Sequence, residues 1–195
     1  GTVLVKDITP GNDSWGNPLG SEISNMVAVG NNVFFKTYDS TNYTWPIWAS
    51  DGTSAGTTKL DQVSGYVGSA YSQGDLLVSY NNKLYFNGYN GSSWNIISYD
   101  PNTTTATSTG IANLNYYQPV VMGGLMWFNS YIPGKGYELT TSDGTLANTG
   151  IFEDLNPNGG SSSPTRLATV GNLLFYVSDD ASIGSQPRYV VGQGI

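Results

Sequence analysis

The chain has 195 residues and a net charge of −7, and it contains neither histidine nor cysteine. These counts exclude histidine-dependent catalysis, histidine or thiolate metal sites and disulfides, and the lack of a basic patch argues against nucleic-acid binding. No apolar run approaches the ~20 residues of a membrane span, so we expect no membrane insertion, and no signal peptide opens the chain.

A first unit with a clear strand pattern extends to residue 60. Its predicted elements are a strand at 24–29, a hairpin signal at 30–32, an aromatic strand at 33–38, a loop at 39–44, a strand at 45–50, a turn at 51–56 and a short strand at 57–60. No stretch shows the i, i+3, i+4, i+7 apolar spacing of a helix longer than a turn or two. The chain is therefore predicted to be all-β.

The pattern of two turn residues followed by an apolar-aromatic run occurs four times. The copies are GNNVFF at 30–35, NNKLYF at 81–86, GGLMWF at 123–128 and GNLLFY at 171–176, with starts 51, 42 and 48 residues apart. Periods of ~40–50 residues, each holding several short strands, indicate β-propeller blades. We predict one β-propeller domain over residues 1–195, with repeats at about 19–60, 64–112, 115–155 and 164–195 plus 1–8.

Two units carry a similar turn motif. The segments WASDGTSAGT (48–57) and GYELTTSDGT (136–145) resemble the ELWxxDGT repeat of large bacterial surface proteins, with Thr140 where the family has Trp. The opening segment 1–11 is similar to the part that follows the motif in that family, whereas segments 83–88 and 98–103 resemble a kelch blade without its glycine pair. The resemblance implies a propeller-like fold and a cell-surface or extracellular location.

The two ends of the chain suggest how the propeller closes. Residues 46–53 align without gaps onto 187–194, and the next family element, the Gly-Thr at 56–57, matches the Gly-Thr at 1–2. We therefore expect a propeller of four blades, each of four antiparallel strands, with the N-terminal strand at 3–8 closing the last blade. A four-repeat fragment of a longer array and half of an eight-bladed dimer are the alternatives.

Binding is expected at one of the two loop faces. In a four-stranded antiparallel blade the hairpins and Asp-Gly-Thr turns fall on one face, and longer loops rich in aromatic residues fall on the other. Variable loops on a rigid scaffold commonly bind ligands, and aromatic rings can lie against the C–H face of a sugar. The predicted ligand-binding residues are Trp15, Tyr43, Trp45, Trp94, Tyr116, Tyr131 and Tyr137, and Trp15 and Trp94 are the best candidates for exposure. Packing between neighbouring blades is the alternative for all seven.

Other aromatic and acidic residues are predicted to be structural. The expected core aromatics on strands are Trp48, Trp127, Phe34, Phe35, Phe86, Phe128, Phe175 and Tyr176. Asp51, Asp100 and Asp143 precede turns, where a carboxylate accepts backbone N–H bonds. We expect no cofactor and no metal site, although a calcium ion on a loop acid such as Asp13 or Asp154, or on channel carbonyls, is an open alternative.

These observations favour a non-enzymatic recognition or adhesion module that binds a glycan or a protein surface through its aromatic-rich loop face. The alternative is a structural repeat unit that self-associates into a surface filament or layer through protein contacts. A glycosidase is a third, less favoured interpretation, because it needs only two carboxylates and no histidine. The chain has three glutamates, and neither Glu138 nor Glu153 is expected to face a shared cleft.

Overall fold

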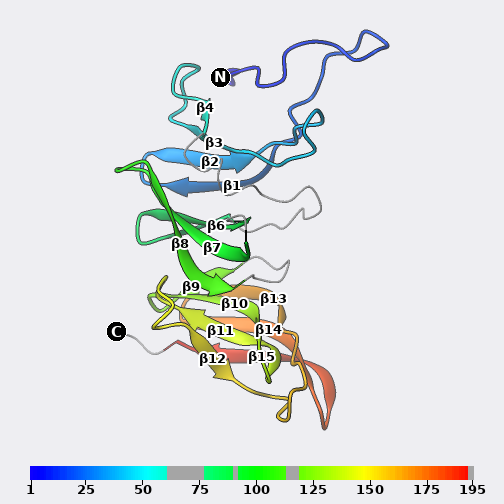
Figure 1. Ribbon diagram of the computed structural model, residues 1–195, viewed down its shortest axis with the longest axis vertical. Helices are drawn as coiled ribbons and strands as arrows, with labels where there is room; N and C mark the ends of the chain where they lie inside the picture. The colour runs from blue at the N-terminus through cyan, green and yellow to red at the C-terminus, as the bar shows by residue number, and fades with distance from the viewer. Residues whose placement is uncertain (61–76, 90–91, 113–118, 193–195) are drawn as a thin grey trace.

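The computed structural model describes residues 1–60, 77–89, 92–112 and 119–192. This part of the chain folds into antiparallel sheets, which we number along the sequence (Figure 1). The first sheet contains β1 (Ser24–Val29), β2 (Asn32–Lys36), β3 (Ile47–Ser50) and β4 (Thr58–Lys59), and the second contains β5 (Leu77–Tyr80), β6 (Lys83–Tyr89), β7 (Trp94–Asp100) and β8 (Thr105–Ala112). The third contains β9 (Val120–Met122), β10 (Leu125–Ile132), β11 (Gly136–Ser142) and β12 (Gly150–Glu153), and the fourth contains β13 (Thr165–Val170), β14 (Leu173–Asp180) and β15 (Gly184–Val191).

The predicted all-β fold with four propeller blades is confirmed. Within each sheet, strands that follow one another in the sequence lie side by side and pair antiparallel. The predicted Gly-Asn and Asn-Asn hairpins form because their residues adopt positive φ, 59° at Gly30 and 48° at Asn81, as tight hairpin turns require. The described residues form no helix that could cross a membrane.

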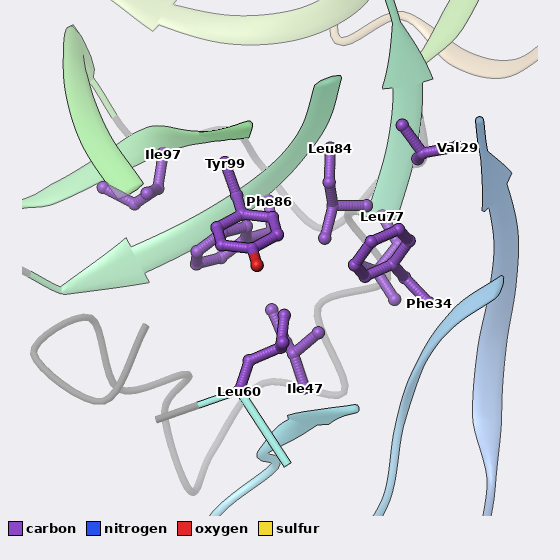
Figure 2. Close-up of a cluster of buried hydrophobic side chains, with 9 residues drawn as sticks. All are labelled: Val29, Phe34, Ile47, Leu60, Leu77, Leu84, Phe86, Ile97 and Tyr99. Atoms are coloured by element: carbon purple, nitrogen blue, oxygen red, sulfur yellow. The ribbon is translucent and has the colours of Figure 1, made fainter. Parts of the chain in front are cut away.

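The core lies between consecutive sheets. One cluster joins the first and second sheets and includes Phe34, Ile47, Leu84, Phe86 and Tyr99 (Figure 2). A second cluster joins the second and third sheets, and a third joins the third and fourth sheets. Each sheet in the middle of the series is therefore covered on both faces, which explains why its strands carry continuous apolar runs.

The same repeat position supplies the contact to the next sheet. Phe34, Tyr85 and Trp127 occupy equivalent places in the first three repeats, and each is buried in the cluster shared with the following sheet. The fourth copy of this position is Phe175, and its side chain is 43% exposed. The prediction that Phe175 belongs to the core is wrong, because no following sheet covers that face within the described residues.

The predicted closure by the N-terminal strand is also absent. The fourth sheet has three described strands, and residues 1–7 belong to no strand. Instead, the Lys6 ammonium donates to the carbonyl oxygen of Thr57 (2.7 Å) and lies 5.9 Å from the ring of Trp48. These contacts hold the N-terminal segment beside the first sheet, at the opposite end of the molecule from the fourth (Figure 1).

Candidate functional site

Three cross-strand aromatic pairs lie at the same place in three successive sheets. They are Tyr38–Trp45, Tyr89–Trp94 and Tyr131–Tyr137, with ring centroids 5.1, 5.4 and 5.2 Å apart. Each pair lies at the end of the hairpin formed by the two middle strands of its sheet. We call these six residues the aromatic row, because the blade repeat places one pair on each of three neighbouring blades.

The first pair depends on a loop stabilised by Asp39. The backbone N–H of Asp39 donates to Thr44 O (2.9 Å), and its carboxylate accepts from the backbone N–H of Thr41 and from both the backbone and side chain of Asn42. These bonds, the Asn42 side chain first among them, lower the pKa of Asp39. They extend the hairpin beyond β2 and β3, so that Tyr38 and Trp45 meet while Tyr43 turns outward at φ 54°.

The second and third pairs are set by strand register. Tyr89 pairs with Trp94 across β6 and β7, and Tyr131 pairs with Tyr137 across β10 and β11. Side chains of directly opposite residues lie on the same face of an antiparallel sheet, so the rings must meet. Tyr131 is 51% exposed and Tyr137 is half-buried, which leaves part of each pair open to solvent.

Trp15 lies outside the aromatic row, at the tip of a compact loop. The Asp13 carboxylate accepts from the backbone N–H groups of Trp15 and Asn17, both at 2.9 Å, and from the Asn17 side chain. The Asn17 side chain is the main reason that the pKa of Asp13 is lowered. The indole is 85% exposed, as predicted.

Four of the seven predicted residues therefore lie at equivalent hairpin ends of three sheets. Trp45, Trp94, Tyr131 and Tyr137 belong to the aromatic row, although the last three lie on strands and not in loops. Tyr43 is exposed beside the first pair, Trp15 is separate, and Tyr116 lies outside the described residues. Sequence reasoning missed Tyr38 and Tyr89, which the strand register would have identified as the partners of Trp45 and Trp94.

The Asp-Gly-Thr turns have the predicted structural role. Asp51 accepts from the backbone N–H and the hydroxyl of Thr53, both at 2.8 Å, and Asp143 accepts from the same two groups of Thr145. In both turns these threonine bonds are the leading reason that the aspartate pKa is lowered. Their carboxylates are used within the turn, and in the second unit Asp100 accepts similarly from the N–H of Asn102.

Glu138 is fully buried at the contact between the third and fourth sheets. Its carboxylate accepts from the backbone N–H of Ser162 (2.9 Å) and from the Ser162 hydroxyl. Burial raises the pKa of Glu138, with the two Ser162 bonds opposing the shift. The buried carboxylate thereby joins the third sheet to Ser162 in the segment before β13.

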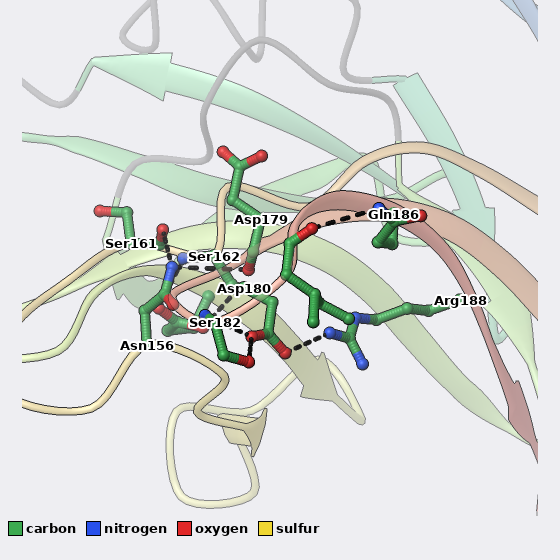
Figure 3. A network of polar contacts seen from close by, with 10 residues as sticks. Asn156, Ser161, Ser162, Asp179, Asp180, Ser182, Gln186 and Arg188 are labelled. Carbon is green, nitrogen blue, oxygen red and sulfur yellow. Dashed lines mark hydrogen bonds and ion pairs between the residues drawn. The ribbon is translucent and has the colours of Figure 1, made fainter.

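A network of polar contacts continues from this point (Figure 3). The side chain of Asn156 donates to the carbonyl oxygens of Ser161 (2.7 Å) and Asp179 (3.4 Å), and the N–H of Asp179 donates to Ser162 O (2.7 Å). On the fourth sheet, bonds from Ser182 and then Arg188 lower the pKa of Asp180 to about 2. The loop between β12 and β13 is thereby attached to both sheets.

The turn face carries a hollow that sequence reasoning did not identify. Its volume is about 550 Å³, and it lies between β6, β7 and β8 of the second sheet and the Asp-Gly-Thr turn of the third. Its lining is mixed, polar and apolar, and includes Lys83, Tyr85, Asp100, Thr107 and Asp143. Within this lining, Asp100 and Asp143 already accept bonds in their own turns, and Lys83 Nζ lies 3.9 Å from Asp100 Oδ2.

Across residues 1–60, 77–89, 92–112 and 119–192, no three acidic side chains come together as a potential metal site.

No family model and no curated protein sequence matches the chain. Similar solved structures include TolB from Acinetobacter baumannii (TM-score 0.46, 13% identity), of which this chain spans 45% while 88% of this chain is covered. A putative exo-β-1,3-galactanase from Bifidobacterium bifidum s17 is similar with a TM-score of 0.38 and 12% identity, over 93% of this chain and 70% of that one. The exo-β-1,3-galactanase from Phanerochaete chrysosporium is similar with a TM-score of 0.42 and 9% identity, over 94% of this chain and 52% of that one.

Proposed function

We propose that the chain is a non-enzymatic recognition module of the cell surface or extracellular space, and that it binds a carbohydrate chain through the aromatic row. The observation that carries the proposal is the repetition of an aromatic pair on three neighbouring blades. A polymer with repeating units can contact several such pairs at once, which raises its affinity above that of a single contact.

The chemistry of the row suits a sugar ligand. Tyrosine and tryptophan offer an apolar ring with a polar group, and they lose little conformational freedom on binding. Exposed Tyr43, in the loop that joins Tyr38 to Trp45, adds to the aromatic surface of the first pair. The expected surface location depends on the resemblance of the two Asp-Gly-Thr segments to repeats of bacterial surface proteins.

A glycan array with a defined oligomeric state tests this proposal. The purified chain is applied at a concentration where light scattering gives its mass, first with calcium and then with a chelator. Selective binding is expected, and the series Tyr131→Ala, Trp94→Ala and Trp15→Ala should identify its site. Each loss of a stacking ring should weaken binding by roughly tenfold, which corresponds to about 1.4 kcal/mol.

Phe152→Ala provides the matched control. Phe152 is a similarly exposed aromatic residue of the third sheet, but it packs on Trp127 away from the aromatic row. Its replacement should leave glycan binding unchanged. A blank array from a monodisperse sample would contradict the carbohydrate proposal and leave a protein surface as the ligand, to be sought with the same three variants.

A further inference from the structure

We call the outer faces of the first and fourth sheets the end faces. Inside the molecule, faces of these two types pack against each other. In the first three repeats, the face that bears Phe34, Tyr85 or Trp127 packs on the following sheet. In the last three repeats, the opposite face, which bears Leu84, Met126 or Leu174, packs on the preceding sheet. Within the described residues, the fourth sheet has no following sheet to cover the face that bears Phe175. The first sheet likewise has no preceding sheet to cover its opposite face.

Both end faces are apolar, the face of the fourth sheet is exposed, and the face of the first sheet is exposed in part. On the fourth sheet, Phe175 and Tyr189 pair across β14 and β15 with ring centroids 6.0 Å apart, and Tyr189 is 64% exposed. Val170 and Val191, which border this pair, are also exposed. The outer face of the first sheet carries Ala28, Val33, Phe35 and Trp48. Ala28 and Val33 are exposed, whereas Trp48 is half-buried and Phe35 is buried. Exposed apolar surfaces of this type commonly mark protein contacts.

The third strand of the fourth sheet also lacks a neighbour. β15 lies at the edge of the described sheet, and an open edge strand can pair with another chain. The segment GTVLV at 1–5 aligns with GTTKL at 56–60, which contains β4, and residues 187–191 align with the segment that contains β3. Since β3 pairs Trp48 with Lys59 and Ala49 with Thr58, the same register pairs Tyr189 with Leu4 and Val190 with Val3.

The N-terminal segment is available for this pairing but is held at the wrong end of its own molecule. Val3 and Leu4 are both 82% exposed. The bond from Lys6 to Thr57 and the contact of Lys6 with Trp48 fix the segment beside the free face of the first sheet. A second molecule whose fourth sheet packs on this face would meet the segment at its open edge.

From these features we infer that the partner of the end faces is a second copy of this chain. The first sheet of one copy packs on the fourth sheet of the other, and residues 3–5 of the first copy add a fourth strand to β15 of the second. Such a head-to-tail contact joins different surfaces of the two copies, so it closes into a ring or continues as a chain. It uses surfaces separate from the aromatic row and does not depend on the proposed carbohydrate ligand.

Cysteine cross-linking tests the predicted register directly, because the natural chain has no cysteine. Leu4→Cys and Tyr189→Cys are made in separate proteins, and the two are mixed under mild oxidation. Opposed residues of paired strands lie within disulfide range, so a mixed dimer should form preferentially over either homodimer. Ile183→Cys lies in the turn between β14 and β15 and is similarly exposed, so it should cross-link at the background level.

Light scattering during size-exclusion chromatography gives the second readout. The mass should rise from 20.8 kDa to a multiple of it with increasing concentration. It should rise further with added salt, because each copy carries a net charge of −7 and salt screens the repulsion between copies. Tyr189→Asp should weaken association at least tenfold, whereas Ile183→Asp should leave it unchanged.

Two results would overturn the inference. One is a mass of 20.8 kDa at all accessible concentrations together with background cross-linking in the mixture. The other is a disulfide formed within single molecules of the double variant Leu4→Cys/Tyr189→Cys, which would show that the chain closes on its own fourth sheet.

Discussion

Phe34 and Phe175 hold the same position in the first and fourth repeats but have opposite environments. Phe34 is 1% exposed and packs on Tyr99 of the second sheet, whereas Phe175 is 43% exposed. The two residues therefore distinguish the interfaces between consecutive sheets from the end faces of the series. Each repeat therefore carries apolar residues that can pack on a neighbouring sheet. These residues are buried only where that neighbouring sheet is present.

The strongest test of the difference is truncation of both rings. Phe34→Ala should lower the free energy of unfolding by about 3–5 kcal/mol, because it leaves a cavity in a closely packed cluster. Phe175→Ala should change it by less than about 1 kcal/mol in dilute solution, as expected for an exposed site. Urea unfolding followed by tryptophan fluorescence measures both. Equal losses at low concentration would mean that the face of the fourth sheet is also covered.

A second test uses the two Asp-Gly-Thr turns, one in an end sheet and one in an inner sheet. Gly52 and Gly144 have φ values of 90° and 92°, so alanine introduces similar backbone strain of about 1–2 kcal/mol at both. A methyl group at Gly52 would meet no atom, whereas at Gly144 it would collide with the buried Tyr85 side chain of the second sheet. Gly144→Ala should therefore cost about 1–3 kcal/mol more than Gly52→Ala.

The same unfolding assay decides this test. Equal costs at Gly52 and Gly144 would contradict the close contact between the second and third sheets. Asp51→Asn and Asp143→Asn serve as controls, because each keeps an acceptor oxygen for the turn threonine.

A third, smaller effect concerns the buried carboxyl group of Glu138, at the contact between the third and fourth sheets. Burial raises the pKa of Glu138 above its ordinary value of 4.5, so the folded state holds the proton more tightly than the unfolded state. The stabilising contribution of the protonated carboxyl is full below pH 4.5 and is lost as the pH rises through the folded pKa. In Glu138→Gln, the free energy of unfolding should no longer fall in this way as the pH rises. The glutamine side-chain oxygen can still accept a hydrogen bond from the N–H of Ser162.

Two further variants complete the pH experiment. Glu153→Gln, on the neighbouring strand and exposed, should keep the pH dependence of the natural chain. Glu138→Ala should cost about 1–3 kcal/mol at all pH values, because it leaves the buried Ser162 N–H without an acceptor. An unchanged pH profile in Glu138→Gln would show that the carboxylate is not buried in solution.

The sequence by itself determined the features that depend on neighbouring residues. The four hairpins and the Asp-Gly-Thr turns were predictable because their bonds join groups a few residues apart, such as Asp51 and Thr53. The blade number followed from the repeat. Four residues of the aromatic row were among the predicted binding residues, although they were expected in loops, whereas three of the four lie on strands. Tyr38 and Tyr89 were missed because a cross-strand partner depends on the register and not on the local pattern.

Only the tertiary structure decided which faces are covered. Phe175 and Trp127 are equivalent in the repeat, yet one is exposed and the other is buried, because burial depends on a sheet far away in the sequence. The N-terminal segment resembles the strand segment at 56–60, but it lies beside the first sheet through Lys6 and Thr57 and does not pair with the fourth. A strand sequence specifies the capacity to pair, whereas the edge that it meets depends on where the rest of the chain places that edge.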